Sequence, residues 1–415
     1  MNRGLGAARK LCKSRSIHSY YARISLIAQR PQGRYISDQR TMQAGNAWQA
    51  PGEAAFDFRS DVMTRPTVSM LEAITNTSLG DDVLQEDAVT CSLEKSVAEL
   101  ANHESALLVM SGTMGNQVAI RTHLTQPPYA VLCDHRGHII NYEGGGVSTW
   151  TGAYIKGIVP KNERYLTLED IMPHAVLGND IHGCPTRVIS LENTLDGMIM
   201  PLDEMKRISE WAHANGLKVH LDGARLWEAV VAGAGSLSEF SSLADSVSLC
   251  FSKGLGAPIG SVLAGSNEFI QKARWFRKTI GGGTRQSGII AAAAQVALNE
   301  TFGSGPNGKG GKLLVSHEMA RKVAKLWTEK GGKLKNPVET NMVWLDLESC
   351  KLSNEDWIEI GRQHGLKFLG GRLVVHYQIS EEAIAKLDKA MNSAISGNFT
   401  PAAKNEKNGQ YCGQA

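Results

Sequence analysis

Short apolar runs recur along this chain between amphipathic stretches, and this alternation limits the fold more than any other feature. Between these runs lie helical patterns such as residues 202–216, where Met205, Ile208, Trp211 and Ala212 recur at three- and four-residue intervals. Strands that alternate with helices predict an α/β fold with a mostly parallel sheet, and ligands of such sheets bind beyond the carboxyl ends of the strands. Six runs are predicted to be buried strands: 106–112, 129–134, 187–193, 218–224, 246–254 and 260–266.

A second, smaller α+β unit is predicted after residue 312. Residues 303–312 contain the GxxxxGK spacing of a phosphate-binding loop, but Gly310 stands where Ser or Thr should hold magnesium, so we interpret this segment as a linker. The tail from Gly397 is polar and is predicted to be disordered. The predicted organisation is a leader (1–43), an arm and large domain (44–302), the linker (303–312), a small domain (313–396) and a tail (397–415).

The small domain is predicted from five segments. They are a helix at 313–330, a strand at 341–347, a helix at 354–365, a strand at 372–379 and a final helix near 381–395.

Charge and cysteine content exclude some classes of protein. The formal net charge is +3, and much of this excess lies in the first forty residues, so a nucleic-acid partner is not expected. Every long apolar segment is broken by Gly, Pro or charge, which argues against a membrane span. Seven cysteines without a CxxC pair fit reduced thiols.

The first forty residues differ from the rest in composition. They hold nine basic residues against one acid, Asp38, as a mitochondrial presequence does. The same composition fits a disordered basic arm, or a protein whose translation starts at Met42. The sequence therefore leaves a mitochondrial and a cytoplasmic location open.

Lys253 follows an apolar run and precedes a glycine-rich loop, in the stretch LCFSKGLGAPIG at 249–260. An arbitrary lysine is a solvated surface charge. A lysine at the end of a buried strand is instead suited to a lowered pKa and to Schiff-base formation with an aldehyde. Lys253 is therefore a candidate reactive amine.

Asp222 ends the predicted strand in HLDGAR and lies one strand–helix–strand unit before Lys253. It could cap the following helix. It could also keep a pyridine nitrogen protonated, so that a pyridoxal ring can accept electrons. On the second interpretation, Asp222 and Lys253 end neighbouring strands in one crevice.

Two further groups of residues could bind a phosphate or a metal ion. Ser111, Gly112 and Thr113 follow a strand and open a helix, where backbone N–H groups and a hydroxyl can bind phosphate. Cys133, His135 and His138 have no second ligand pair, so no zinc site is predicted.

With these elements assembled, the sequence resembles the fold-type I pyridoxal-phosphate (PLP) enzymes, and within them the low-specificity L-threonine aldolases of the β-eliminating lyase family. The resemblance covers roughly residues 56–395. Its motifs include FDFRSDVMTRP (56–66), GDDVLQEDAVTCSLE (80–94), SGTMGNQ (111–117), HIINYEGGG (138–146), SLENT (190–194), HLDGAR (220–225), CFSKGLGAPIGS (250–261), RKTIGGGTRQSG (277–288), NMVW (341–344) and RLVVH (372–376).

The resemblance implies a fold-type I large domain with a smaller C-terminal α+β domain, PLP as cofactor, and a dimer-based oligomer, expected to be a tetramer, with shared active sites. It also implies a role for individual residues. Lys253 would bind the cofactor, Asp222 would contact its pyridine nitrogen and His138 its ring, and its phosphate would be bound by Gly112, Thr113 and Ser252. The substrate carboxylate would be bound by Ser60, Arg225 and Arg372, and His182 would lie near the substrate hydroxyl. A neighbouring subunit would contribute two further cofactor-binding residues, Lys278 and Arg285.

The implied reaction is cleavage of L-threonine or L-allo-threonine to glycine and acetaldehyde, with His138 and His182 together as base. The alternative is a related PLP-dependent β-eliminating lyase or a transaminase. Two departures bear on specificity at the β-carbon: RSDVM replaces the commoner RSDTVT, and Leu195 follows ENT where many members have histidine.

Overall fold

The structure is a computed structural model that describes residues 47–303, 307–308 and 311–401. The predicted leader, most of the predicted tail and part of the predicted linker lie outside these residues.

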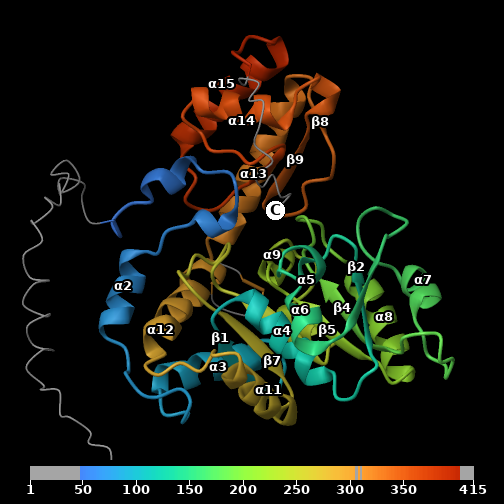
Figure 1. Ribbon diagram of the computed structural model, residues 1–415. Coiled ribbons are helices and arrows are strands. Elements are labelled where there is room, and N and C mark those ends of the chain that lie inside the picture. Colours follow the sequence, from blue (N-terminus) through green and yellow to red (C-terminus); the bar gives the residue numbers. More distant parts are fainter. Residues whose placement is uncertain (1–46, 304–306, 309–310, 402–415) are drawn as a thin grey trace, which may run out of the picture. The chain divides into compact units, whose positions relative to one another are not determined.

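The main element is a seven-stranded sheet in the order β1-β7-β6-β5-β4-β2-β3 (Figure 1). The β2–β3, β2–β4, β4–β5 and β5–β6 pairs are parallel, while β7 is antiparallel to both of its neighbours. The predicted mostly parallel α/β sheet is confirmed. Its strands are β1 (Ser105–Val109), β2 (Ala130–Asp134), β3 (Tyr154–Ile158), β4 (Thr186–Glu192), β5 (Lys218–Asp222), β6 (Ser246–Cys250) and β7 (Ser261–Gly265).

Both faces of this sheet are buried, because successive side chains of one strand enter different hydrophobic clusters. Leu108 of β1 packs in the largest cluster, whereas Leu107 and Val109 pack in another with residues of α4 (Gly112–His123). Side chains of a strand alternate between its two faces, so a strand buried on both sides has a continuous apolar run. This is why the sequence shows runs and not alternation.

Helices cover the sheet and connect its strands (Figure 1). In α8 (Leu202–Ala214), Met205, Ile208 and Ala212 are fully buried in the largest cluster, as their spacing predicts. Among the helices of the described residues, none combines the length and the hydrophobicity needed to cross a membrane. The other α-helices of this part are α2 (Val68–Thr75), α3 (Ala88–Leu100), α5 (His138–Asn141), α6 (Gly146–Thr151), α7 (Leu168–Ile171), α9 (Leu226–Val231), α10 (Leu237–Ser241), α11 (Asn267–Thr279) and α12 (Gly288–Ala297).

Short 3-10 and π segments complete the secondary structure. They are the 3-10 helices η1 (Gly52–Phe56), η2 (Asp61–Met63), η3 (Met172–His174) and η5 (Glu348–Cys350), and the π-helix η4 (Leu298–Phe302).

A second, three-stranded antiparallel sheet has the order β10-β9-β8 and its own hydrophobic cluster, which includes Trp327, Trp357 and Leu373. Arg372 opens β10 and pairs with Trp344 of β9. The elements of this part are α13 (Leu313–Glu329), β8 (Lys333–Leu334), β9 (Met342–Asp346), α14 (Asn354–Gln363), β10 (Arg372–Val374) and α15 (Glu381–Ser396).

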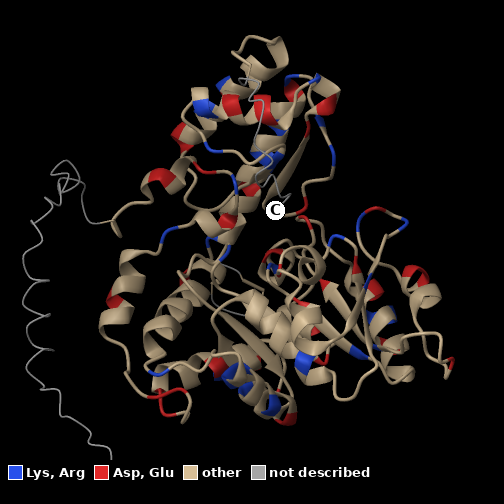
Figure 2. Ribbon diagram, in the orientation of Figure 1, with Lys and Arg blue, Asp and Glu red and all other residues tan. Residues whose placement is uncertain are grey.

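Charged side chains are mixed in sign along the described chain. Figure 2 shows Lys and Arg beside Asp and Glu on the same helices.

Candidate active site

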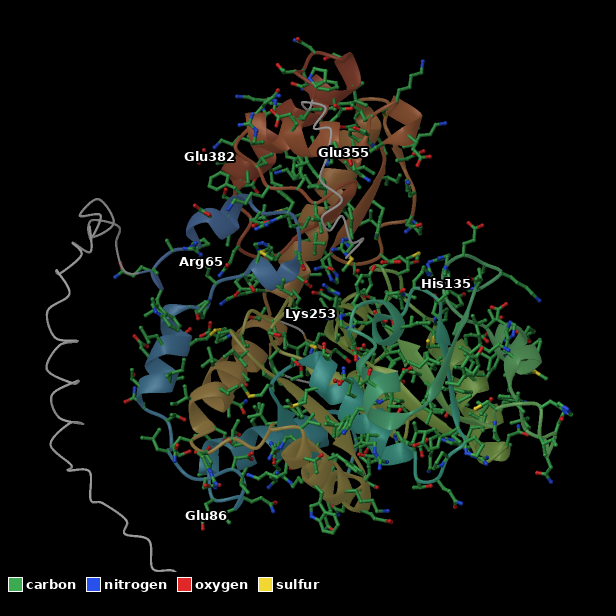
Figure 3. The ribbon with its side chains drawn as sticks, in the orientation of Figure 1. Arg65, Glu86, His135, Lys253, Glu355 and Glu382 are labelled. Carbon is green, nitrogen blue, oxygen red and sulfur yellow. The ribbon has the colours of Figure 1, made fainter. Side chains whose placement is uncertain are left out.

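The two residues on which the sequence interpretation rests lie at neighbouring strand ends. Asp222 is the last residue of β5 and pairs with Ser248 of the parallel strand β6. Lys253 follows the end of β6 by three residues. Of the residues labelled in Figure 3, Lys253 lies at the centre, whereas Glu86, Glu355 and Glu382 lie near the periphery. The structure thus brings Asp222 and Lys253 to the same edge of the sheet.

Asp222 is buried and held by a side-chain amide. Asn116 of α4 donates from Nδ2 to Asp222 Oδ2 at 2.6 Å and to Glu143 Oε1 at 2.9 Å, and Asp222 Oδ1 accepts from the Ala224 N–H at 3.0 Å. The same Glu143 oxygen lies 2.9 Å from His138 Nδ1. Ligand atoms of His138, Glu143 and Asp222 all lie within 4.8 Å of one another. This spacing would suit a metal ion, but the amide group of Asn116 already bridges the two carboxylates.

His138 has a raised pKa. Burial alone would lower the pKa of this imidazole, but the hydrogen bond to Glu143 and the charge of Asp222 outweigh burial and raise it above its ordinary value. Because His138 Nδ1 faces a carboxylate, its proton is held there, and Nε2 is the ring atom left to exchange a proton with another group.

Glu192, the last residue of β4, lies beside the same group. Its Oε2 accepts from the His138 N–H at 2.9 Å. Burial, and then the charge of Asp222, raise the pKa of Glu192 to about 8. The Lys253 ammonium opposes this shift in Glu192 and lowers the pKa of His138. Lys253 is therefore close enough to act electrostatically on both.

A close-packed helix start lies next to the end of β6. Ser111 caps α4 by accepting from the Met114 N–H at 3.2 Å. A β-carbon on Gly112 would lie 2.6 Å from Cys250 Sγ, so only glycine fits there without a shift of the neighbour. The first N–H groups of a helix have no partner within it and attract anions. Gly112, Thr113 and the nearby Ser252 therefore fit the predicted phosphate site.

Two of the arginines predicted to bind a carboxylate lie close together. Arg225 donates from Nε and Nη2 to Asp61 at 2.8 and 2.6 Å, which leaves its Nη1 group and one Nη2 proton for another partner. The pKa of the partly buried Arg372 is lowered by burial and then by the charge of Arg225, so the two cations are close. Ser60 precedes Asp61 and caps η2. Asp196 is a second carboxylate whose charge acts on Arg372, so the two guanidinium groups lie near two carboxylates.

A cavity of about 620 Å³ opens beside Arg372. Tyr142, Trp344 and Arg372 line it, and the Tyr142 ring centroid lies 5.6 Å from that of His138. The cavity therefore adjoins Arg372 directly, and one of its lining residues, Tyr142, lies next to His138.

Three predicted site residues are not brought to this group within one subunit. His182 lies on an exposed loop before β4, where its Nδ1 lies 2.9 Å from Asp180 and its side chain is 87% exposed. Lys278 is exposed near the end of α11, and Arg285 donates to Asp81 at 2.6 Å. The assignment of His182 beside the substrate hydroxyl is thus not supported by its position, because the loop carries the side chain to the surface.

Four residues of the site were not predicted. Asp61, Asn116, Glu143 and Glu192 all fall inside motifs that carry the family resemblance. Nothing in their local pattern separates them from a helix cap or a surface charge; only the fold brings Asn116 against Glu143 and Asp222.

These residues fit PLP. The donor set holds a primary amine for the aldehyde, a buried carboxylate for the ring nitrogen, and a helix start with Ser and Thr hydroxyls for the phosphate. Each lies at the carboxyl edge of the sheet, where such folds bind cofactors.

Comparison with known proteins identifies the family. The model of the β-eliminating lyases matches residues 57–350, which is more than half of the chain. The chain belongs to this family. It is a PLP-dependent lyase with the fold-type I architecture that the sequence predicted.

Curated relatives of this β-eliminating lyase include enzymes with different names. It is 53% identical to the aldolase vrtJ of Penicillium aethiopicum, over 86% of this chain and 90% of that protein. It is 46% identical to the alanine racemase TOXG of Cochliobolus carbonum and 46% identical to the low-specificity L-threonine aldolase of Eremothecium gossypii, in each case over 82% of this chain and 88% of the relative.

Among solved structures, the threonine aldolase of Leishmania major matches the lyase with a TM-score of 0.69. The match covers 82% of this chain and 99% of that one at 19% identity, and it supports the fold.

Proposed function

We propose that this lyase is an aldolase that cleaves L-threonine, L-allo-threonine and related β-hydroxy-α-amino acids to glycine and an aldehyde. The observation that carries the proposal is the meeting of Lys253, Asp222 and the His138–Glu143 pair at one edge of the sheet, next to two arginines that suit a carboxylate. Relatives named as threonine aldolases support the same reaction.

Arg225 and Arg372, with Ser60, bind and orient the substrate carboxylate. Guanidinium groups match a planar carboxylate with two parallel hydrogen bonds. The ion pair with Asp61 fixes the plane of the Arg225 guanidinium before substrate arrives. The α-carbon is thereby held at a defined place, and the β-substituent can enter the cavity beside Tyr142 and Trp344.

His138 accepts the proton of the substrate β-hydroxyl at Nε2. Glu143 holds the Nδ1 proton and stabilises the imidazolium that forms. Loss of this proton is what allows the aldehyde to leave. When PLP is bound, it accepts the electrons left on the α-carbon, and Lys253 and Asp222 are the residues that hold its aldehyde carbon and its ring nitrogen.

The test is an assay of the purified holoenzyme with L-threonine. We expect glycine and acetaldehyde in equal amounts. Pyruvate and ammonia without glycine would indicate β-elimination, and amino transfer to an added oxo acid would indicate a transaminase; either result would overturn the proposal.

Alanine racemisation is a second candidate, favoured by the 46% identity to a protein named as an alanine racemase. Racemisation also uses the Lys253 amine, the Asp222 carboxylate and the site for the substrate carboxylate. It breaks the covalent bond between the α-carbon and its hydrogen, however, and needs no group that accepts a hydroxyl proton. Chiral analysis of alanine incubated with the holoenzyme decides between them. Formation of D-alanine at a kcat/KM above that for threonine cleavage would favour the racemase.

We also propose that two subunits share each site, with Lys278 and Arg285 reaching the cofactor phosphate of the partner. A phosphate carries about −1.5 to −2 charges, while a helix start compensates about half a charge, so further cations are needed. Near these residues Trp275 is 77% exposed and Leu84 is 64% exposed, which supports a protein contact there.

Mixed refolding tests this arrangement. Lys253→Ala and Arg285→Ala subunits, each inactive alone, should regain partial activity when they are refolded together, because one of the two sites in a mixed dimer carries neither change. Heterodimers verified by differential tags that show no regained activity would mean that Arg285 serves its own subunit or has no such role.

A further inference from the structure

We propose that Asn116, supported by a hydrogen-bonded series of the buried His220 and Ser246 and the partly buried His123, positions Asp222 and the His138–Glu143 pair as one unit. The inference rests on the proposed function, because it assumes that Asp222 faces the cofactor ring nitrogen. It adds four positioning residues that hold the groups in contact with the cofactor.

The orientation of the Asn116 amide follows from its neighbours. Its nitrogen lies 2.6 Å from an Asp222 oxygen and 2.9 Å from a Glu143 oxygen. Ionised carboxylates only accept hydrogen bonds, so the NH₂ group must face them, and each carboxylate receives one of its two protons. Asn116 is itself only 1% exposed, so water does not compete for these bonds.

The carbonyl oxygen of Asn116 then fixes the next residue. Because Oδ1 can only accept, His220 Nε2, at 3.0 Å, must carry a proton and donate it. His220 Nδ1 is then an acceptor, and it lies 2.8 Å from Ser246 Oγ. His220 and Ser246 are both fully buried, so each bond is made inside the protein.

The series ends at His123. With the Ser246 hydroxyl proton given to His220, Ser246 Oγ accepts from His123 Nε2 at 2.8 Å. His123 is stacked on Phe269, with ring centroids 4.5 Å apart, which holds the imidazole in place. Burial lowers the pKa of His220 to about 4 and that of His123 to about 3. Both rings are therefore neutral near pH 7. A neutral imidazole has one nitrogen that donates and one that accepts, as His220 must have between Asn116 and Ser246.

The electrostatic consequence concerns the two carboxylates. Glu143, Glu192 and Asp222 all lie around His138. Lys253 and His138 are the cations that act on them, and their other hydrogen-bond donors are Asn116, Gln117, whose Nε2 lies 3.3 Å from Glu143 Oε2, and the Ala224 N–H. Cys250 and His220 are the other titratable groups near Asp222. Without the amide, Asp222 and Glu143 would lose the one donor that they share, and each carboxylate would be held less firmly in its place.

The experiment measures PLP binding to apoenzyme variants, with no substrate present. In Asn116→Ala we expect the Kd for PLP to rise about tenfold or more, as hydrogen bonds to charged groups imply. Thr122→Ala is the control, because it removes a buried hydrogen bond, to the Val118 carbonyl at 2.6 Å, from the same helix without touching the series.

A second pair of variants separates positioning from mere packing. His220→Ala should weaken PLP binding, whereas His220→Gln, whose amide can donate to Asn116 and accept from Ser246, should restore most of it. If Asn116→Ala does not fold, the two His220 variants still test whether the hydrogen-bonded series positions Asp222. Equal PLP binding by wild type, His220→Ala and His220→Gln would overturn the inference, and so would an unchanged Kd for PLP in a folded Asn116→Ala.

Asp222→Asn, measured in parallel, separates this inference from the proposed function. If Asp222→Asn binds PLP as the wild type does, the assigned role of Asp222 fails. If Asp222→Asn binds poorly while the Asn116 and His220 variants bind normally, only the positioning series fails.

Discussion

Arg225 donates two hydrogen bonds to the carboxylate of Asp61, 164 residues earlier in the chain, from Nε at 2.8 Å and from Nη2 at 2.6 Å. Burial opposes ionisation of Asp61, but the charge and hydrogen bonds of Arg225 outweigh it and hold the pKa of Asp61 below its usual range. Arg225, which we propose to bind the substrate carboxylate, is therefore already paired within its own subunit.

We expect Asp61→Ala to lower the free energy of unfolding by about 3–5 kcal/mol, because it leaves a buried guanidinium without its partner. Denaturant titration measures this. Glu99→Ala breaks the exposed Lys95–Glu99 pair at 3.9 Å and should change stability by no more than about 1 kcal/mol. Equal effects of the two substitutions would show that the Asp61 pair contributes no more than a surface pair.

Lys253→Ala should abolish covalent attachment of PLP and lower turnover by on the order of 10³-fold or more, as loss of covalently acting residues does in other enzymes. The visible absorbance of the bound cofactor and the rate of acetaldehyde formation give the two readouts. Lys272→Ala, which changes an exposed lysine on α11, should leave both unchanged. Full activity of Lys253→Ala would rule out Lys253 as the residue that binds PLP covalently.

Glu143→Gln should change the pH dependence of kcat/KM. His138 must be unprotonated to accept the hydroxyl proton, so activity falls as the pH drops through its raised pKa. With the Glu143 charge removed, burial dominates and the pKa of His138 falls, which moves the acid limb to lower pH. The maximal rate should also fall, by roughly 10²-fold, because the base is weaker. The exposed Glu86→Gln should have the wild-type profile, and an unshifted acid limb in Glu143→Gln would argue against His138 as the base.

Gly112→Ala should destabilise the protein by about 1–3 kcal/mol, because its β-carbon would lie 2.6 Å from the buried Cys250 Sγ. It should also weaken PLP binding. Removal of the sulfur in Gly112→Ala/Cys250→Ala should recover part of both losses. Gly178→Ala is the matched control, since no atom lies within 4 Å of its added carbon. No recovery in the double variant would mean that the contact is not the cause.

The sequence predicts the strands of the sheet well where both faces are buried. β3 was missed: Tyr154 is 57% exposed and Lys156 is half-buried, so this edge strand has no apolar run. The strand predicted at 246–254 ends at Cys250, because the glycines after Lys253 form a loop in which Gly256 has a φ of +86°. The strand predicted at 372–379 likewise ends at Val374.

For the site, residues at strand ends were predictable and residues that meet across the fold were not. Asp222 and Lys253 follow apolar runs, so their shared edge can be inferred from chain order. The contact of Asn116 with Asp222 joins positions 106 residues apart, and no local spacing encodes it. His182 is the opposite case. The family resemblance predicts it near the substrate, whereas its side chain lies on an exposed loop.

Helix α4 carries residues at both ends of the proposed cofactor site. Gly112, at the phosphate end, and Asn116, behind the residue assigned to the ring nitrogen, are one helical turn apart on the same rigid element. Four residues of α-helix span about 6 Å along the axis, and each residue turns the helix by about 100°. A single residue inserted between Thr113 and Asn116 would therefore rotate the amide away from both carboxylates while leaving the phosphate end untouched. The residue count of α4 thus fixes the spacing between Gly112 and Asn116, while β5 places Asp222 against the amide.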